Sequence, residues 1–495
     1  MTNAASDKRT IVKNAGFLMA SQIATWMLTL LLTVFLPRYL GAAAIGKFHL
    51  ANSTWAIAGI LISFGMDTLL TKEIARRPDE TTELLGTSLL LRALLYLPAL
   101  AGMIGYLALF RYPADTALVV YIIGAAALIQ QFGGAVQASL QGLERMDRLA
   151  LANVASKATT TAGSLLMLAL GQGIYAVAGV SVISAVVYLT LQLWFVRQHY
   201  AIELRWNLSD ATRMLRNGLP YMASQAFLIL YQQVDIVTIS LLVDDRTVGW
   251  YGAADQLFGT LLFVPTVFIT AVFPSLARSF AERPEDLPKL MSRSFGMLLL
   301  ISVPVGLGIM VLADATVVLL FGDGFAGSGP VLSVMGIVLL LTYQNMLLGR
   351  FLIATDRQNV WTGITAAITL ASIPLDLVLI PWCQRAFGNG AIGGALKFVI
   401  TELAMLVVGL RLLPKGSLGK ADAWLAIRCL IAGGLMALVT WPFRDAFVAI
   451  PLALGVTAYV VVALALGLVR RDEIAAFSQA ARRTVMRRLG HSEAA

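Results

Sequence analysis

Apolar segments about as long as a lipid bilayer is thick follow one another along almost the whole sequence. A helix that spans a bilayer needs about 20 predominantly apolar residues. Stretches such as Leu84 to Leu100 do not alternate between apolar and polar residues as the strands of a membrane β-barrel would. The chain is therefore predicted to be an all-α integral membrane protein with about 14 transmembrane helices, at residues 14–36, 45–66, 84–109, 116–140, 150–170, 174–196, 217–243, 249–273, 294–313, 329–349, 359–381, 390–410, 423–441 and 447–469.

The composition excludes a large soluble domain. Of the 495 residues, 58% are hydrophobic and 13% are charged, whereas soluble proteins have about 25% charged and roughly 45–50% apolar residues. No long polar segment remains that could build a catalytic or DNA-binding domain. We therefore predict that the chain is not an enzyme and does not bind nucleic acid.

No cofactor or metal is predicted. The segment from Gly41 to Lys47 resembles a phosphate-binding loop, but Phe48 stands where a magnesium ligand is required, and Gly322 to Gly327 lacks the strand and helix of a dinucleotide site. The two cysteines, Cys383 and Cys429, have no metal-binding spacing. The sequence therefore predicts no nucleotide that could supply energy to this chain.

The distribution of basic residues predicts the orientation of the chain. Of the 37 lysines and arginines, 27 lie on the side of the N-terminus in the predicted topology. Because cytoplasmic loops carry the excess of basic residues, both termini are predicted to be cytoplasmic. The basic tail, residues 470–495, is expected to rest on anionic membrane lipid.

The first and second halves of the chain repeat one another. Asn14 to Gln22 reads NAGFLMASQ and Asn217 to Gln225 reads NGLPYMASQ, and the same offset of 203 residues pairs Gly46 with Gly249. Later pairs are Glu144-Arg145 with Asp356-Arg357 and Gly173 with Gly390. Each half has six helices, so both enter the membrane in the same orientation, an arrangement typical of transporters whose two bundles rock around a central site.

The repeat predicts the domain organisation. The predicted parts are a cytoplasmic N-terminus (1–13), an N-terminal six-helix bundle (14–200), a cytoplasmic linker (201–216), a C-terminal six-helix bundle (217–413), two additional transmembrane helices (414–469) and the basic tail (470–495).

Polar side chains follow helical spacing on the first and seventh predicted helices, which are equivalent in the repeat. Gln22 and Thr25 lie on the first helix, and Gln225 and Gln232 lie on the seventh. These residues are predicted to line a polar lumen. The alternative is that they hold neighbouring helices together.

Two acidic residues, Asp235 and Asp255, are predicted to lie at similar depths in adjacent helices. A pair of carboxylates could hold a proton or a sodium ion between them, which would couple transport to an ion gradient. The alternative is that each carboxylate pairs separately with a neighbouring helix.

Three basic residues, Arg92, Lys157 and Lys397, are predicted to lie well inside the membrane. Charged groups at this depth usually face a bundle interior or a water-filled cavity. They are therefore predicted to bind an anionic substrate. The alternative is that they pair with acids such as Glu402 or Asp376.

Short motifs follow one another in a specific order along both halves of the chain. They are Pro37 to Gly41, Gly46 to Phe48, Phe64 to Arg76, Gln141 to Arg145, Leu215 to Pro220, Val234-Asp235, Val248 to Ala254 and Leu320 to Phe325. In their order and spacing, over roughly the whole chain, these motifs resemble the Wzx-like or RfbX-like oligosaccharide flippases of the multidrug/oligosaccharidyl-lipid/polysaccharide exporter superfamily.

The resemblance implies a V-shaped, alternating-access transporter in the inner or plasma membrane of a prokaryote. Its implied substrate is a polyprenyl-pyrophosphate-linked oligosaccharide, moved from the cytoplasmic to the outer leaflet for export of a polysaccharide or O-antigen-type glycan, and a glycan polymerase is a possible partner. A cation-coupled multidrug antiporter and a lipid II flippase of the same superfamily are the alternatives.

Overall fold

The computed structural model describes residues 2–200, 203–204, 206–414 and 416–468 of the chain. Within these ranges the chain forms α-helices and four short 3-10 turns and no β-strand, as predicted. The α-helices are α1 (Thr2–Leu40), α2 (Ala42–Ser63), α3 (Met66–Arg76), α4 (Thr81–Leu109), α5 (Ala114–Gly142), α6 (Met146–Ala169), α7 (Ile174–Arg197), α8 (Leu208–Leu242), α9 (Asp245–Leu261), α10 (Phe263–Glu282), α11 (Leu287–Phe321), α12 (Ser328–Ala354), α13 (Gln358–Phe387), α14 (Ala391–Leu412), α15 (Lys420–Thr440) and α16 (Ala449–Ala465).

Most of the predicted spans are confirmed as long apolar helices. Among the described residues, 11 helices are long and apolar enough to cross a membrane, or 12 if α2 and α3 form one span bent by 44°. The predicted count of 14 is thus approximate. The helix α16, with 17 residues, is apolar but too short to be counted among the eleven. The helix α6, which contains Lys157 and three consecutive threonines, is not among them either.

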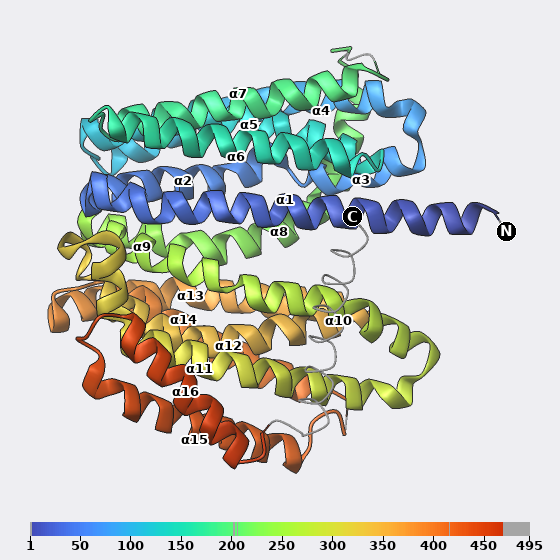
Figure 1. Ribbon diagram of the computed structural model, residues 1–495. Coiled ribbons are helices and arrows are strands. Elements are labelled where there is room, and N and C mark those ends of the chain that lie inside the picture. Colours follow the sequence, from blue (N-terminus) through green and yellow to red (C-terminus); the bar gives the residue numbers. More distant parts are fainter. Residues whose placement is uncertain (1, 201–202, 205, 415, 469–495) are drawn as a thin grey trace, which may run out of the picture. The chain divides into compact units, whose positions relative to one another are not determined.

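The chain forms two compact units. The first contains Met1–Leu261, Val317–Leu332 and Asn359–Met405, and the second contains Leu262–Thr316, Ser333–Gln358 and Leu406–Ala495. Figure 1 shows the helices in sequence order by colour. The division of the chain into two six-helix bundles at the predicted boundaries stays a prediction.

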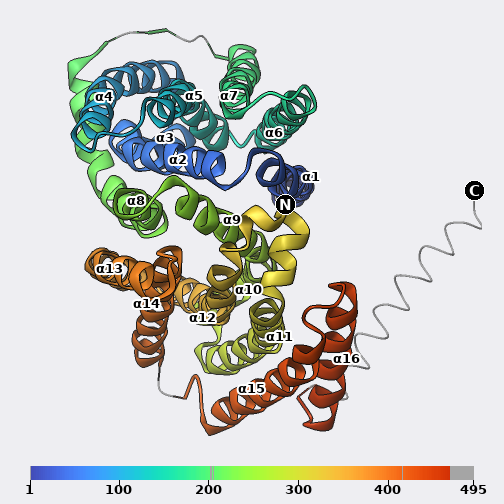
Figure 2. The same cartoon turned by 90° about the vertical axis from the view of Figure 1, so that its left-hand side faces the viewer.

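In the first unit, α2 lies beside α4, α5, α8 and α9 (Figure 2). The crossing of α2 and α9 depends on two glycines that the repeat makes equivalent. A Cβ atom on Gly46 would lie 1.7 Å from the carbonyl oxygen of Asp245, and one on Gly249 would lie 1.9 Å from that of Ala42. Since Ala42 and Asp245 are also 203 residues apart, the contact is reciprocal, as a two-fold axis between the helices requires.

A second equivalence supports the repeat at the level of turns. Glu144 precedes α6 and Asp356 precedes α13, and both have a φ of 57°, which is unusual for residues other than glycine. Arg148 then donates a hydrogen bond to the carbonyl of Phe195, and Arg357 donates one to the carbonyl of Leu412. Both halves therefore use the same turn, and an arginine near it binds the C-terminal end of another helix, although Arg148 stands four residues after Glu144 and Arg357 directly follows Asp356.

In the second unit, α15 and α16 pack against α11. Met436 of α15 and Tyr459 of α16 share a buried cluster with Val303. The hydroxyl of Tyr459 donates a hydrogen bond of 3.0 Å to the carbonyl of Leu300. The two additional helices thus complete a core with α11.

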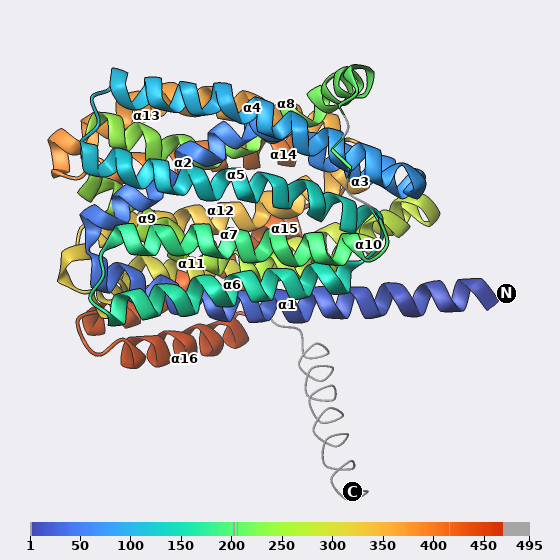
Figure 3. The same cartoon turned by 90° about the horizontal axis from the view of Figure 1, so that it is seen from above.

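The predicted ends of the chain are only partly described. The helix α1 begins at Thr2, so the predicted cytoplasmic N-terminal segment continues the first membrane helix, as Figure 3 shows. The predicted basic tail, residues 470–495, lies outside the described residues.

Candidate functional site

Four helices of the first unit, α8, α9, α13 and α14, meet around a buried lysine. The glycine-rich start of α14 allows this approach. A Cβ atom on Gly393 would lie 2.6 Å from the backbone of Ile380 in α13, and one on Gly394 would lie 2.9 Å from the ring of Tyr251 in α9. Small residues let membrane helices pack closely, and Lys397 follows one turn later on the same helix.

Lys397 lies between two carboxylates in this centre. Its ammonium forms an ion pair with Asp235 of α8 and lies 4.0 Å from a carboxylate oxygen of Asp376 of α13. All three side chains are 0% exposed. The second oxygen of Asp235 accepts a hydrogen bond of 2.6 Å from the hydroxyl of Tyr251. The structure therefore joins the predicted ion-coupling residue Asp235 to the predicted substrate-binding residue Lys397.

Aromatic rings and a second acid extend the same centre. The ammonium of Lys397 lies 3.8 Å from the ring centroid of Phe398 and 5.2 Å from that of Tyr231. The hydroxyl of Tyr231 donates a hydrogen bond of 2.9 Å to Glu402. The predicted residue Asp255 lies one turn after Tyr251 on α9, within electrostatic reach of Asp235 and Lys397.

Arg92 forms a separate buried site in the first unit. Its guanidinium lies 2.5 Å from a carboxylate oxygen of Asp67 in α3 and donates a hydrogen bond of 2.6 Å to the carbonyl of Gln131 in α5. The Arg92 side chain is 0% exposed, whereas that of Asp67 is 38% exposed. Gly134 leaves room for the pair, because a Cβ atom there would lie 3.1 Å from the guanidinium.

Lys157 differs from the other two basic residues. It lies on α6, is half-buried, and forms no ion pair within 4 Å with any residue in the described ranges. Among the three predicted cations, Arg92 and Lys397 thus show the pairing that the sequence left open as the alternative, and Lys157 does not.

The predicted lumen residues lie on α1 and α8. Gln22 and Gln232 are exposed, and Thr25 and Gln225 are half-buried. Thr25 donates a hydrogen bond to the carbonyl of Gln22 in its own helix. Among the described side chains, no hydrogen bond joins these residues of α1 to those of α8, so their role as opposing walls of one lumen stays a prediction.

Several residues of these sites were not singled out by the sequence. Tyr251 and Gln131 carry no charge, and Asp376 entered only as an alternative partner of a lysine. Asp67 lies within the Phe64 to Arg76 motif, which was noted for its resemblance rather than for its acid. The signal that could have identified the pair was an acidic residue, Asp67, directly after the end of the predicted helix that precedes the one with Arg92.

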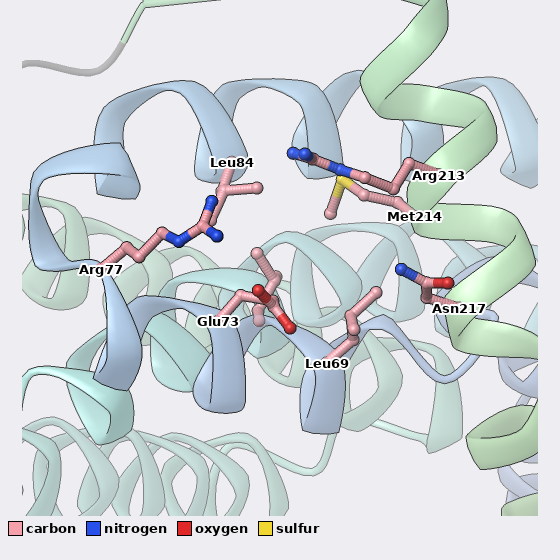
Figure 4. A pocket seen from close by; sticks show the side chains of 8 residues that line it. Leu69, Glu73, Arg77, Leu84, Arg213, Met214 and Asn217 are labelled. Atoms are coloured by element: carbon pink, nitrogen blue, oxygen red, sulfur yellow. The ribbon is translucent and has the colours of Figure 1, made fainter.

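A cavity of about 210 Å³ lies at the ends of α3, α4 and α8. Figure 4 shows Arg77 and Arg213 approaching it from opposite sides, with Glu73 between them. Arg77 pairs with Glu80 at 3.0 Å, and Arg213 pairs with Asp210 at 2.9 Å. Each arginine therefore has its own carboxylate, and the cavity offers little unbalanced positive charge to an anion.

A smaller cavity, of about 100 Å³, lies between the start of α6 and the end of α7. Arg145, Arg148 and His199 line it, and each guanidinium lies 3.5 Å from a ring nitrogen of the histidine. Within the described residues, no carboxylate lies within ion-pair distance of either arginine. This cavity has the unbalanced positive charge that suits a phosphate group.

Family models and one curated relative match this chain. The model of the family described as polysaccharide biosynthesis protein matches residues 11–280, and the model described as MatE matches residues 220–378. A relative from Haloferax volcanii, named "Probable low-salt glycan biosynthesis flippase Agl15", is 22% identical over 373 residues. That match covers 74% of this chain and 77% of the relative.

Solved structures share the fold. The lipid II flippase MurJ in an inward closed conformation has a TM-score of 0.72 at 12% identity, covering 94% of this chain and all of the other. An inward-facing multidrug resistance MATE family transporter of the MOP superfamily has a TM-score of 0.60 at 16% identity, covering 83% and 94%. At these identities the likeness establishes a multi-pass membrane transporter fold and leaves the substrate open.

Proposed function

Since the chain belongs to the polysaccharide biosynthesis protein family, we propose that it is a transporter that flips a lipid-linked oligosaccharide across the membrane. The observation that carries this function is the family match over residues 11–280, together with a glycan flippase relative that spans 74% of the chain. The substrate is a polyprenyl-pyrophosphate-linked glycan, which moves from the cytoplasmic to the outer leaflet for export of a polysaccharide or O-antigen-type glycan.

Such a substrate has an anionic pyrophosphate and a polar glycan, and the chain offers groups for both. Gln22, Thr25, Gln225 and Gln232 provide a polar wall for the glycan. Lys157 is the strongest candidate for the pyrophosphate, because it is the predicted cation without an ion-pair partner within the described ranges. Arg92 would bind a substrate only if it contacted the substrate together with Asp67 or if its ion pair with Asp67 broke. The same holds for Lys397 and Asp235.

A direct transport assay tests the function. Purified protein in vesicles should move a fluorescent polyprenyl-pyrophosphate-linked sugar between leaflets while its covalent mass stays the same. A product of altered mass would favour a glycan polymerase or ligase. Movement of lipid II or of a cationic drug in place of the glycan would favour the two alternatives, with which the MurJ and MATE folds are compatible.

Ion coupling belongs to the same proposal. Asp235 and Asp255 link transport to a proton or sodium gradient, because buried carboxylates near one another favour binding of a proton or a cation. The contacts of Asp235 with Lys397 and Tyr251 support a role for this residue in a charge-dependent step.

The proposed setting is the inner or plasma membrane of a prokaryote, with both termini in the cytoplasm. Anionic lipid and a glycan polymerase are proposed partners. The small cavity with Arg145, Arg148 and His199 supports contact with lipid phosphate, since it lies at a helix end that the charge distribution places on the cytoplasmic side.

A further inference from the structure

The buried centre around Lys397 contains more carboxylates than cations. Lys397 is its one described ammonium or guanidinium group, while Asp235 and Asp376 both lie within 4.0 Å of that ammonium. Asp255 and Glu402 add negative groups close by. Burying a charge is unfavourable unless the charge is paired. The ammonium of Lys397 therefore reduces the electrostatic cost of burying Asp235 and Asp376 close together.

The surroundings of the ammonium are those of a bound cation. Two carboxylates contact it from α8 and α13, and the faces of Phe398 and Tyr231 cover it at 3.8 and 5.2 Å. Aromatic faces and carboxylates together are a typical environment for a monovalent or organic cation. The described residues contain no group of three or more histidine, cysteine or acidic side chains suited to a metal ion.

Asp376 leaves part of this site unsatisfied. Neither of its carboxylate oxygens accepts a hydrogen bond from the described residues, although the side chain is 0% exposed. Its closest ion-pair contact is the 4.0 Å approach of Lys397, whereas Asp235 has both the ammonium and the Tyr251 hydroxyl. Lys397 thus forms its close ion pair with Asp235 and neutralises the charge of Asp376 from a greater distance.

We propose that Lys397 fills a monovalent-cation site with its own side chain, so that no metal ion binds between Asp235 and Asp376 in the natural chain. The corollary is that shortening this side chain opens the site to a free small cation, such as sodium, potassium, ammonium or ethylammonium. This narrows the proposed ion coupling, because sodium is then excluded at Asp235 while a proton on a carboxylate is not. The inference rests on the proposed function only for that consequence.

Cation-dependent thermal unfolding of the purified full chain tests the proposal without a transport substrate. The melting temperature is measured in chloride salts of the four cations against N-methylglucamine at constant ionic strength. The wild type should show no difference between sodium and N-methylglucamine. Lys397→Ala should gain a saturable rise of about 3 °C or more with at least one small cation, and Lys397→Ala/Asp376→Asn should lose it.

Two controls keep the outcomes decisive. Lys47→Ala removes a lysine from an ion pair with Asp115, whose side chain is 47% exposed, and should gain no cation-specific rise. Lys397→Ala/Asp235→Asn removes one positive and one negative charge together, so it should fold where the single variant is too unstable.

Two results would overturn the site. One is a saturable sodium effect in the wild type that Asp376→Asn abolishes, since the lysine would then share the site with a metal ion. The other is a Lys397→Ala variant that folds but whose melting temperature responds to no small cation. A Lys397→Ala variant that folds in none of the salts, while Lys397→Ala/Asp235→Asn folds, would count in the same way. Because these tests measure binding, loss of glycan transport alone would count against the proposed function and leave the cation site standing.

Discussion

At the scale of residues, two ion pairs that each contain a fully buried basic side chain are central to the proposed function. Arg92 is paired with Asp67, and Lys397 is paired with Asp235. Charged side chains are expensive inside a membrane, so a pair is retained only where structure or function requires it. The contribution of each pair to stability therefore has to be measured separately from its effect on transport.

A double-mutant cycle on Arg92 and Asp67 makes that separation. Arg92→Ala should lower the free energy of unfolding by about 1–3 kcal/mol, because the variant loses hydrogen bonds to a charged partner and to the Gln131 carbonyl. It should also impair glycan export at normal membrane expression. Chemical unfolding and an export assay on Arg92→Ala, Asp67→Ala and the double variant measure both effects.

The double variant distinguishes the two roles of Arg92. If Arg92 only neutralises Asp67, removing both should restore much of the stability and the export. If Arg92 binds the pyrophosphate, stability should recover while export stays low. Wild-type export by Arg92→Ala would end its role in anion binding.

Asp235→Asn and Asp255→Asn should differ in how much they destabilise the protein, but both should remove the coupling of transport to an ion gradient. Asp235→Asn leaves the buried Lys397 without its closest carboxylate and should cost about 3–5 kcal/mol of stability. Asp255→Asn keeps that pair and should cost less. Vesicle transport by the wild type should depend on an imposed proton gradient, and both variants should lose that dependence.

The matched control for these carboxylates is Asp445→Asn, since the Asp445 side chain is 91% exposed. It should retain the wild-type dependence on the gradient. Unchanged ion dependence in Asp235→Asn and Asp255→Asn would remove both residues from the coupling site.

At the scale of elements, the fold depends on places where two helices approach more closely than side chains allow. The crossing of α2 and α9 is one such place, with Gly46 and Gly249 facing backbone carbonyls across it. Since the two contacts are related by the repeat, the crossing lies on the local two-fold axis. A substitution there acts on both halves at once.

Gly46→Ala should therefore destabilise the chain. The added Cβ would lie 1.7 Å from a backbone oxygen that cannot move without its helix. We expect a loss near the upper end of about 1–3 kcal/mol, with a lower melting temperature. Gly102→Ala on α4 is the control, because a Cβ atom there meets nothing within 4 Å. Equal melting temperatures for the two variants would contradict the close crossing.

Sequence patterns predicted the helices better than their breaks and partners. Each span predicted from hydropathy coincides with at least one helix of the structure. The prediction succeeds because every segment inside a membrane must satisfy its own backbone hydrogen bonds, whatever its neighbours are. The predicted span 249–273 merged α9 with α10. The predicted span 45–66 ended near the break at Phe64 and Gly65, and the more polar helix α3, which begins at Met66, was not predicted as a helix of its own. The repeat was visible because equivalent glycines and turns keep their residue types.

The sites were less predictable for a physical reason. Asp235 and Lys397 are 162 residues apart, and their contact depends on how α8 and α14 pack. The sequence could name intramembrane charges, since each is costly wherever it lies, but it could not choose between a substrate and a carboxylate as the partner of each cation. The choice of Asp255 as the partner of Asp235 overlooked Tyr251, one turn earlier on the same helix.

At the scale of the whole molecule, the orientation in the membrane decides which leaflet supplies the substrate. The excess of basic residues on one side predicts cytoplasmic termini. Membrane insertion follows this charge bias rather than the later packing of helices, so the prediction stands apart from the arrangement of the two units. It requires its own measurement.

Thiol labelling in intact cells provides that measurement with little background, because both native cysteines are buried. Asp445→Cys, in the predicted outer connection between α15 and α16, should react with a membrane-impermeant maleimide added outside. Asp79→Cys, in the predicted inner connection between α3 and α4, should react only after the membrane is permeabilised. Both positions are exposed, so access to the reagent depends on the side of the membrane alone. The reverse pattern would place the termini outside and turn the proposed direction of flipping around, whereas labelling of both variants in intact cells would contradict the span assignment between them.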